Sequence, residues 1–297
     1  MASLGRFARE VASRSPIPIN QTLHSLSQWA ISVYNPGMNV YSRDWEVLII
    51  LDACRPDTMR KIGPEYGFDT AETVWSVANM SDEWMERTFI DEYTTEIENT
   101  LYVSGNPFTQ FHELDDLHDL REVWQYAWDE KIKGVPARPV TDTALTAWSD
   151  TAAERMIIHY MQPHFPSIPH PDVGEFGDID TFGYGWDTVW EDAGDTIPWD
   201  VVREAYEDNL RYVLEEINLL LDNLVADRVS ITSDHANAMG EFGFRGHPND
   251  VLHPSIRRVP WTETTGRGPG EYESTADWDE GEADTGIEEQ LEALGYY

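Results

Sequence analysis

Positive charge is scarce in this sequence. The 297 residues include 55 acidic side chains and only 20 basic ones, which gives a formal net charge of −35. Only three of the basic residues are lysines, at Lys61, Lys131 and Lys133. A surface with this charge repels nucleic acid and anionic membranes, so we expect neither of them as a partner.

The shortage of lysine, the excess of acid and the 41% of hydrophobic residues together resemble proteins of halophilic archaea that accumulate salt. At molar salt the Debye length is only about 3 Å, so repulsion between surface carboxylates is screened and the fold tolerates it. We therefore predict a halophilic archaeal protein.

Cysteine and long apolar runs are also rare. The single cysteine, Cys54, excludes an intramolecular disulfide and fits a reducing compartment, so we expect the cytoplasm. No run approaches the roughly 20 apolar residues that span a bilayer. The first residues carry arginines but no long apolar core, which does not fit a secretory signal. We predict an N-terminal helical segment over residues 1–44 and no integral membrane segment.

Apolar runs do occur at strand length. Val47–Leu51 is continuously apolar, which favours a strand buried on both faces. Further strands are expected over residues 100–105, 155–163 and 227–235, and helices over residues 82–93, 150–157 and 203–225. Strands that alternate with helices predict an α/β fold, a three-layer sandwich with a mostly parallel central sheet.

Composition changes along the chain suggest its boundaries. Residues 45–261 hold the predicted strands and helices and form the expected main folded domain. Within them, residues 166–200 are rich in Gly, Pro, Asp and aromatic residues and are interpreted as a long loop or lid. Residues 262–297 lose apolar periodicity and are strongly acidic, which predicts a mostly disordered tail.

Three predicted strands end in carboxylates or imidazoles. The first ends at Asp52, the third leads to His164, and the last runs into Asp234 and His235. The carboxyl ends of parallel strands form the ligand-binding edge of a sheet. A carboxylate directly after a buried strand is costly unless it is paired or bound to a metal, so Asp52 is expected to hold a cation. Strand alternation favours His159 as a core histidine.

The segments "VLIILDACRPD" and "VSITSDHANAMGEFGFRGHP" resemble the alkaline phosphatase superfamily, specifically its sulfatase-like branch. The first carries an Asp-x-x-Arg-x-Asp pattern at Asp52, Arg55 and Asp57. The second resembles the Thr-Ser-Asp-His and Gly-His patterns of that branch, with matching residues at Thr232, Ser233, Asp234, His235, Gly240, Glu241, Gly246 and His247. Ala236 and Asn237 replace the familiar Gly-Glu. The resemblance covers about residues 45–261 and implies an alkaline-phosphatase-like fold.

The resemblance also implies a metal-bound hydroxyl or formylglycine nucleophile some 25–30 residues after the first aspartate. Formylglycine sulfatases carry Cys-x-Pro-x-Arg there, and this sequence does not; Cys54 is interpreted as a small buried residue. Ser81, at the start of a predicted helix, is the favoured nucleophile. The alternatives stay open that Ser76 is the nucleophile, or that Ser81 only caps the helix and neither serine is the nucleophile.

The resemblance implies one metal ion whose ligands are Asp52, Asp234, His235 and Ser81. Such a metal lowers the pKa of the serine hydroxyl and polarises a phosphoryl or sulfuryl oxygen. The further catalytic residues are expected to be Arg55, His164 and His247, which neutralise charge or protonate the leaving oxygen. A site dominated by oxygen favours one divalent ion, Mn²⁺, Mg²⁺ or Ca²⁺, with Zn²⁺ as an alternative.

The sequence therefore predicts a metal-dependent hydrolase or transferase that acts on a phosphate or sulfate ester through a metal-bound serine. The expected substrate is a small-molecule or glycan-precursor ester. The competing interpretation is a catalytically silent, sulfatase-like binding protein. The oligomeric state is not predicted.

Overall fold

A computed structural model describes residues 37–69, 72–177, 188–249 and 251–274 of the chain. Its centre is a seven-stranded sheet in the order β2-β9-β6-β1-β5-β3-β4. Strands β1, β3, β4, β5 and β6 pair in parallel, and β9 is antiparallel to both of its neighbours. Their bounds are β1 Val47–Leu51, β2 Glu72–Trp75, β3 Thr100–Ser104, β4 Asp119–Glu122, β5 Arg155–Tyr160, β6 Val229–Thr232 and β9 Arg258–Thr264.

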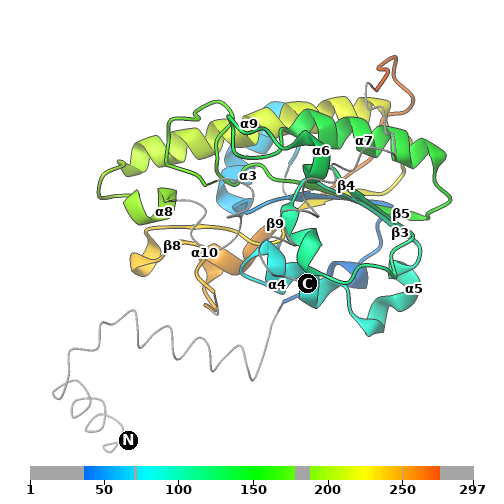
Figure 1. Cartoon of the computed structure of the whole chain (residues 1–297), viewed down its shortest axis with the longest axis horizontal. Helices are drawn as coiled ribbons and strands as arrows, with labels where there is room; N and C mark the ends of the chain where they lie inside the picture. The colour runs from blue at the N-terminus through cyan, green and yellow to red at the C-terminus, as the bar shows by residue number, and fades with distance from the viewer. Residues whose placement is uncertain (1–36, 70–71, 178–187, 250, 275–297) are drawn as a thin grey trace, which may run out of the picture.

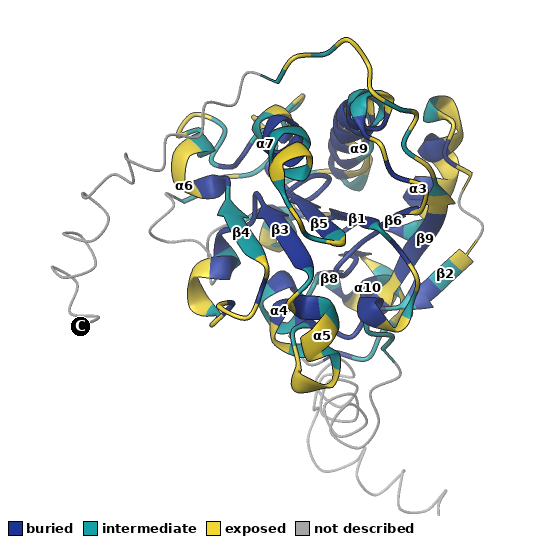
Figure 2. Cartoon of the chain, turned by 90° about the vertical axis from the view of Figure 1, so that its right-hand side faces the viewer, coloured by how far each residue is buried: buried dark blue, intermediate teal, exposed yellow. Residues whose placement is uncertain are grey.

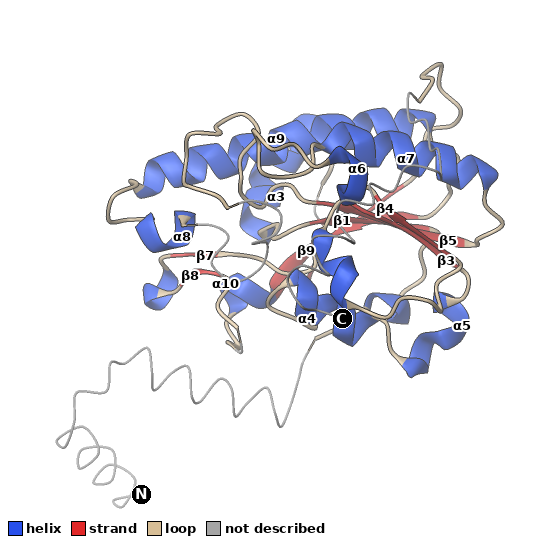
Figure 3. Ribbon diagram, viewed as in Figure 1, coloured by secondary structure: helices blue, strands red, loops and turns tan. Residues whose placement is uncertain are grey.

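Helices cover both faces of this sheet. On one face lie α3 (Pro56–Ile62), α7 (Ala137–Asp150) and α9 (Trp199–Asn223), and on the other lie α4 (Ser81–Thr88), α5 (Thr94–Ile97) and α10 (Pro254–Arg257) (Figures 1 and 2). Two further short helices are α6 (Trp124–Ala127), directly after β4, and α8 (Val189–Asp192), before α9. Strands β7 (Ala238–Met239) and β8 (Arg245–Gly246) form a separate antiparallel hairpin. Figure 3 shows the resulting layers. The expected three-layer α/β sandwich with a mostly parallel central sheet is confirmed.

Two hydrophobic cores flank the sheet, and β1 contributes to both. Val47, Ile49 and Leu51 pack under the α9 face, whereas Leu48 and Ile50 pack under the α4 face. This division follows from the alternation of side chains along a strand. Because both faces are covered, all five residues are fully buried, as the continuous apolar run predicts.

The longest helix, α9, forms as its apolar pattern predicts. It begins at Trp199, four residues before the expected start, and its apolar stripe is buried in the first core. The buried stripe comprises Tyr206, Leu210, Val213, Leu214, Ile217, Leu220 and Leu221.

The predicted helix over residues 150–157 is wrong, since β5 begins at Arg155 and the preceding helix α7 ends at Asp150. The buried face of α7 includes Thr141 and Thr143 beside Val140 and Ala144. Polar threonines at core positions hide the helical period of this segment from the sequence pattern.

The chain beyond residue 261 also differs from the expected boundary. Strand β9 continues to Thr264 between β2 and β6. The following residues lie at the C-terminal end of α9, where the amide of Arg267 donates to the Leu221 carbonyl and the amide of Gly266 donates to the Ala226 carbonyl just after the helix. The predicted loop over residues 166–200 holds the short helix α8 and the start of α9. Residues 1–36, 178–187 and 275–297, which include most of the predicted N-terminal segment and tail, lie outside the described residues.

Candidate metal centre and nucleophile

Asp52, Asp234 and His235 meet at the carboxyl ends of the two central strands β1 and β6. His235 Nε2 lies 3.4 Å from Asp52 Oδ1 and 3.5 Å from Asp234 Oδ2. One ligand atom from each residue lies within 4.8 Å of the others, and all three side chains are buried. The convergence that the sequence predicts is therefore present. We call these three residues the carboxylate cluster.

A tight turn after β1 orients Asp234 within the carboxylate cluster. Ala53 adopts a left-handed conformation with φ of 61°, and its amide donates to Asp234 Oδ1 at 3.0 Å. The amide of His235 donates to the same oxygen at 2.8 Å. Because two backbone donors hold Oδ1, the other oxygen, Oδ2, is directed towards His235 and Ser81.

Ser81 reaches this cluster from the first turn of α4. Its hydroxyl donates to Asp234 Oδ2 at 2.6 Å and lies 3.4 Å from Asp52 Oδ2. The helix cap is Met80, without a side-chain hydrogen bond, so Ser81 is not the N-cap. The observed geometry therefore removes the interpretation in which Ser81 serves only as a helix cap.

Ser76 is held differently. Its hydroxyl donates to the backbone carbonyl of Asp234 and accepts from the amide of Ala78. It thus braces the loop after β2, and its hydrogen bonds among the described residues do not include a carboxylate. The arrangement favours Ser81 over Ser76 as the hydroxyl at the cluster, while its role as nucleophile stays a prediction.

Two further imidazoles, those of His164 and His247, lie next to His235. His164 Nε2 lies 3.1 Å from His247 Nε2, and the rings of His235 and His247 are 4.6 Å apart between centroids. His164 follows β5 and His247 follows the β7–β8 hairpin, so separate segments bring them together. At 3.1 Å, one of the two Nε2 atoms donates to the other, which places one shared proton beside the cluster.

Sequence reasoning missed Asn106, which follows β3. The side-chain NH₂ group of Asn106 donates to Asp52 Oδ2 at 2.9 Å, while its side-chain oxygen Oδ1 accepts from the backbone amide of Phe108. The predicted strand over residues 100–105 ends beside Asn106, and an asparagine directly after a buried strand is the signal that could have found it.

His159, expected to be a core histidine, is fully buried in β5 and lies beside the carboxylate cluster, with Nε2 3.7 Å from Asp234 Oδ2. Burial lowers its pKa below the ordinary value, despite the carboxylates of Asp234 and Asp52.

Burial and the neighbouring charges shift the pKa values of Asp52, His235 and the adjacent His247 in different directions. Burial raises the pKa of Asp52, but the imidazoles of His164 and His235 outweigh it and bring the pKa below its ordinary value. Burial likewise opposes the charged form of His235, yet Asp234 and Asp52 raise its pKa to about 9. Burial and the neighbouring His235 and His164 hold the pKa of His247 well below the usual range.

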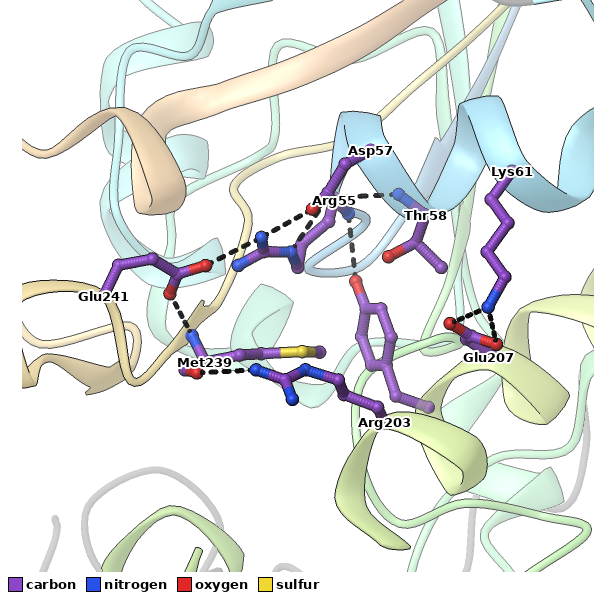
Figure 4. A pocket seen from close by; sticks show the side chains of 9 residues that line it. Arg55, Asp57, Thr58, Lys61, Arg203, Glu207, Met239 and Glu241 are labelled. Atoms are coloured by element: carbon purple, nitrogen blue, oxygen red, sulfur yellow. Dashed lines mark hydrogen bonds and ion pairs between the residues drawn. The ribbon is translucent and has the colours of Figure 1, made fainter. Parts of the chain in front are cut away.

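Arg55, predicted to act on substrate oxygens, lies in a separate network. Its guanidinium bonds Asp57 at 2.7 Å, Glu241 at 2.9 Å and the carbonyl of Asn237 at 2.6 Å (Figure 4). We call Arg55, Asp57 and Glu241 the Arg55 network. It borders a cavity of about 340 Å³, also lined by Thr58, Lys61, Arg203, Tyr206, Glu207 and Met239. The catalytic role of Arg55 stays a prediction.

Cys54 is fully buried, and burial raises the pKa of its thiol far above the ordinary range. A thiol in this environment is unreactive. The structure therefore agrees with the interpretation of Cys54 as a small buried residue.

The carboxylate cluster fits a divalent metal ion. Asp52 Oδ1 is buried and has no hydrogen-bond partner among the described residues. Two buried carboxylates whose oxygens converge on one hydroxyl and one imidazole need positive charge, which the proton on His235 supplies in the metal-free protein and a divalent ion would supply in its place. Oxygen and imidazole donors suit Mn²⁺, Mg²⁺, Ca²⁺ or Zn²⁺, so the chemistry of the ligands does not single out one ion.

Comparison with known proteins supports the fold. No family model matches the sequence, and no curated protein matches it either. Among solved structures, the integral membrane lipooligosaccharide phosphoethanolamine transferase A from Neisseria meningitidis aligns with a TM-score of 0.52 at 12% identity. That alignment covers 89% of this chain and 58% of the transferase.

A 2-O GAG sulfatase aligns with a TM-score of 0.51 at 9% identity, over 80% of this chain and 65% of the sulfatase. The chain has the sulfatase-like fold. It spans less than two thirds of the length of either protein. Within the described residues, no helix has both the length and the apolar character needed to cross a membrane.

Proposed function

We propose that this sulfatase-like protein is a metal-dependent enzyme that hydrolyses or transfers a phosphate or sulfate ester through Ser81. The observation that carries the proposal is the Ser81 hydroxyl 2.6 Å from Asp234 Oδ2, inside a buried cluster with Asp52 and His235. A serine hydroxyl is a weak nucleophile unless a base or a metal activates it, and this cluster offers both.

The cluster would hold one divalent ion through Asp52, Asp234, His235 and Ser81. When bound, the ion would lower the pKa of the serine hydroxyl and neutralise charge on the ester. Asp234 Oδ2 already accepts the hydroxyl hydrogen of Ser81, so this carboxylate is placed to take the proton as the serine oxygen attacks. Asn106 holds Asp52 Oδ2 in position.

The leaving oxygen needs a proton when its bond to phosphorus or sulfur breaks. The His164–His247 pair, with its Nε2 atoms 3.1 Å apart, is placed to supply the proton that the two rings share. Water or an acceptor hydroxyl then displaces Ser81 from the covalent ester, which gives hydrolysis or transfer respectively. The proposal includes both phosphate and sulfate esters. The organic part of the ester is proposed to be a small molecule or a glycan precursor.

The test is turnover of nitrophenyl phosphate, bis-nitrophenyl phosphate and nitrophenyl sulfate in molar KCl with added Mn²⁺. Ser81→Ala is expected to lower kcat at least ~10³-fold, because it removes the attacking oxygen. Ser76→Ala is the matched control and is expected to retain most of the activity. Intact mass spectrometry should detect an ester adduct on the wild type and none on Ser81→Ala.

If the Ser81→Ala variant stays active, the reaction does not pass through a serine ester, and water attacks the substrate directly. The catalytically silent alternative makes a different prediction, since a purified wild-type protein without stoichiometric metal and without turnover would support a binding role.

A further inference from the structure

His159 is held in one orientation by residues from two other elements. Trp84 of α4 packs edge-on against its ring at 5.8 Å between centroids, and Tyr102 of β3 stacks on it at 6.3 Å. The Tyr102 hydroxyl also lies 2.8 Å from His159 Nδ1. All three side chains are buried, so the ring has no freedom to turn towards solvent. Its other nitrogen, Nε2, therefore has a fixed direction.

That second nitrogen is unusual for a core histidine. His159 Nε2 is buried and has no hydrogen-bond partner among the described residues. Asp234 Oδ2 lies 3.7 Å from it. An unpaired polar atom in a protein interior costs free energy, and a histidine chosen for packing alone is expected to satisfy both nitrogens. The arrangement calls for a role in which Nε2 serves Asp234.

His159 is not itself one of the expected metal ligands. The ligand atoms that come within 4.8 Å of one another belong to Asp52, Asp234 and His235, and His159 is not in that group. It lies next to the ligand Asp234. Residues that support a metal ligand from behind in this way fix its orientation and charge, and their loss typically weakens metal binding ~10–100-fold.

We infer that His159, locked by Tyr102, is a positioning residue for the metal ligand Asp234. We assign the Tyr102 hydroxyl as the donor to Nδ1, because the opposite tautomer would turn the lone pair of Nε2 towards the carboxylate of Asp234. The imidazole proton then lies on Nε2 and faces Asp234 Oδ2. The backbone amides of Ala53 and His235 hold Oδ1, and His159 steadies the opposite oxygen. This inference rests on the metal centre of the proposed function.

The experiment measures the dissociation constant for Mn²⁺ and Zn²⁺, by competition with a coloured chelator, on the full-length protein in molar KCl. His159→Phe keeps a ring for Trp84 and removes both nitrogens, and it is expected to raise the Kd ~10–100-fold. His159→Gln keeps an N–H donor at the end of the side chain and is expected to recover part of this loss. Tyr102→Phe removes only the hydroxyl and should give a smaller increase.

Tyr160→Phe is the matched control, because Tyr160 follows His159 in β5 and its buried hydroxyl, which pairs with Thr141, belongs to the opposite face. It removes a hydroxyl of equal burial and should leave the Kd unchanged. Melting temperatures of the metal-free variants show whether each one folds. If His159→Phe does not fold, Tyr102→Phe decides the question.

A wild-type Kd in folded His159→Phe, or in Tyr102→Phe when only that variant folds, would overturn the inference. So would an equal rise in Tyr160→Phe, because that would reduce the effect to general loss of packing. A wild-type protein that binds metal but turns over no ester would remove the proposed function and leave the role of His159 standing.

Discussion

The carboxylate cluster and the Arg55 network lie within a few residues of each other in the chain, at the same edge of the sheet, yet they differ in completeness. In the Arg55 network, every guanidinium nitrogen has a protein acceptor: Asp57, Glu241 or the Asn237 carbonyl. In the carboxylate cluster, Asp52 Oδ1 is buried and makes no hydrogen bond among the described residues, although His235 Nε2 faces it at 3.4 Å. A completed network stabilises the fold, whereas an incomplete buried one indicates a missing ligand.

The largest expected effect comes from breaking the incomplete cluster. Asp234→Asn keeps the size of the side chain and removes the charge that a divalent ion needs, so we expect the metal Kd to rise ~10³-fold or more, with loss of turnover. Titration with Mn²⁺ or Zn²⁺ measures the change. Glu241→Gln, the same type of substitution in the Arg55 network, should leave the metal Kd near the wild-type value, and a large rise there would contradict the distinction.

The next effect concerns pH. The pKa of His235 is raised from 6.5 to about 9, so its proton stabilises the metal-free protein at low pH, and this contribution is lost as the pH rises through 9. Because a metal must displace that proton, the apparent metal affinity should increase by up to ~10-fold per pH unit between 6.5 and 9.

Calorimetry in two buffers with different ionisation enthalpies would detect the released proton. An affinity that stays constant over this pH range would show that His235 is not protonated in the metal-free protein.

Arg55→Met tests the completed network. The substitution keeps the aliphatic stem and leaves Glu241 and Asp57 without their partner. Fully buried broken pairs cost ~3–5 kcal/mol, but here the two acids are 34% and 62% exposed, so we expect roughly 1–3 kcal/mol of lost unfolding free energy. Urea denaturation measures it. The metal Kd is the companion measurement, and a strong rise would instead assign Arg55 to the metal centre.

The smallest expected effect concerns salt, which acts on charges at the surface and little on buried ones. Reducing KCl from molar to ~0.1 M lengthens the Debye length from ~3 to ~10 Å and exposes the repulsion of a chain with net charge −35. The melting temperature should fall by several degrees, while the ratio of wild-type to His159→Phe metal affinity should change little because those groups are buried. A melting temperature independent of salt would contradict the predicted halophilic adaptation.

The sequence by itself determined the central part of the fold and the carboxylate cluster. Val47–Leu51 forms a strand buried on both faces because its apolar run is continuous, and Asp52 follows where that strand ends. Asp234 and His235 follow β6 in the same way. These features depend on residues adjacent in the chain, so local pattern and the sulfatase-like motifs were sufficient to predict them.

Tertiary structure decided what depends on contacts between distant segments. Strands β2, β4 and β9 lack a continuous apolar run and form because neighbouring strands supply their hydrogen bonds. Asn106 and Ser81 reach Asp52 and Asp234 from β3 and α4, across 54 and 153 residues of chain. Strand alternation could place His159 on one face of β5, but only folding put Tyr102 on one side of its ring and Asp234 on the other.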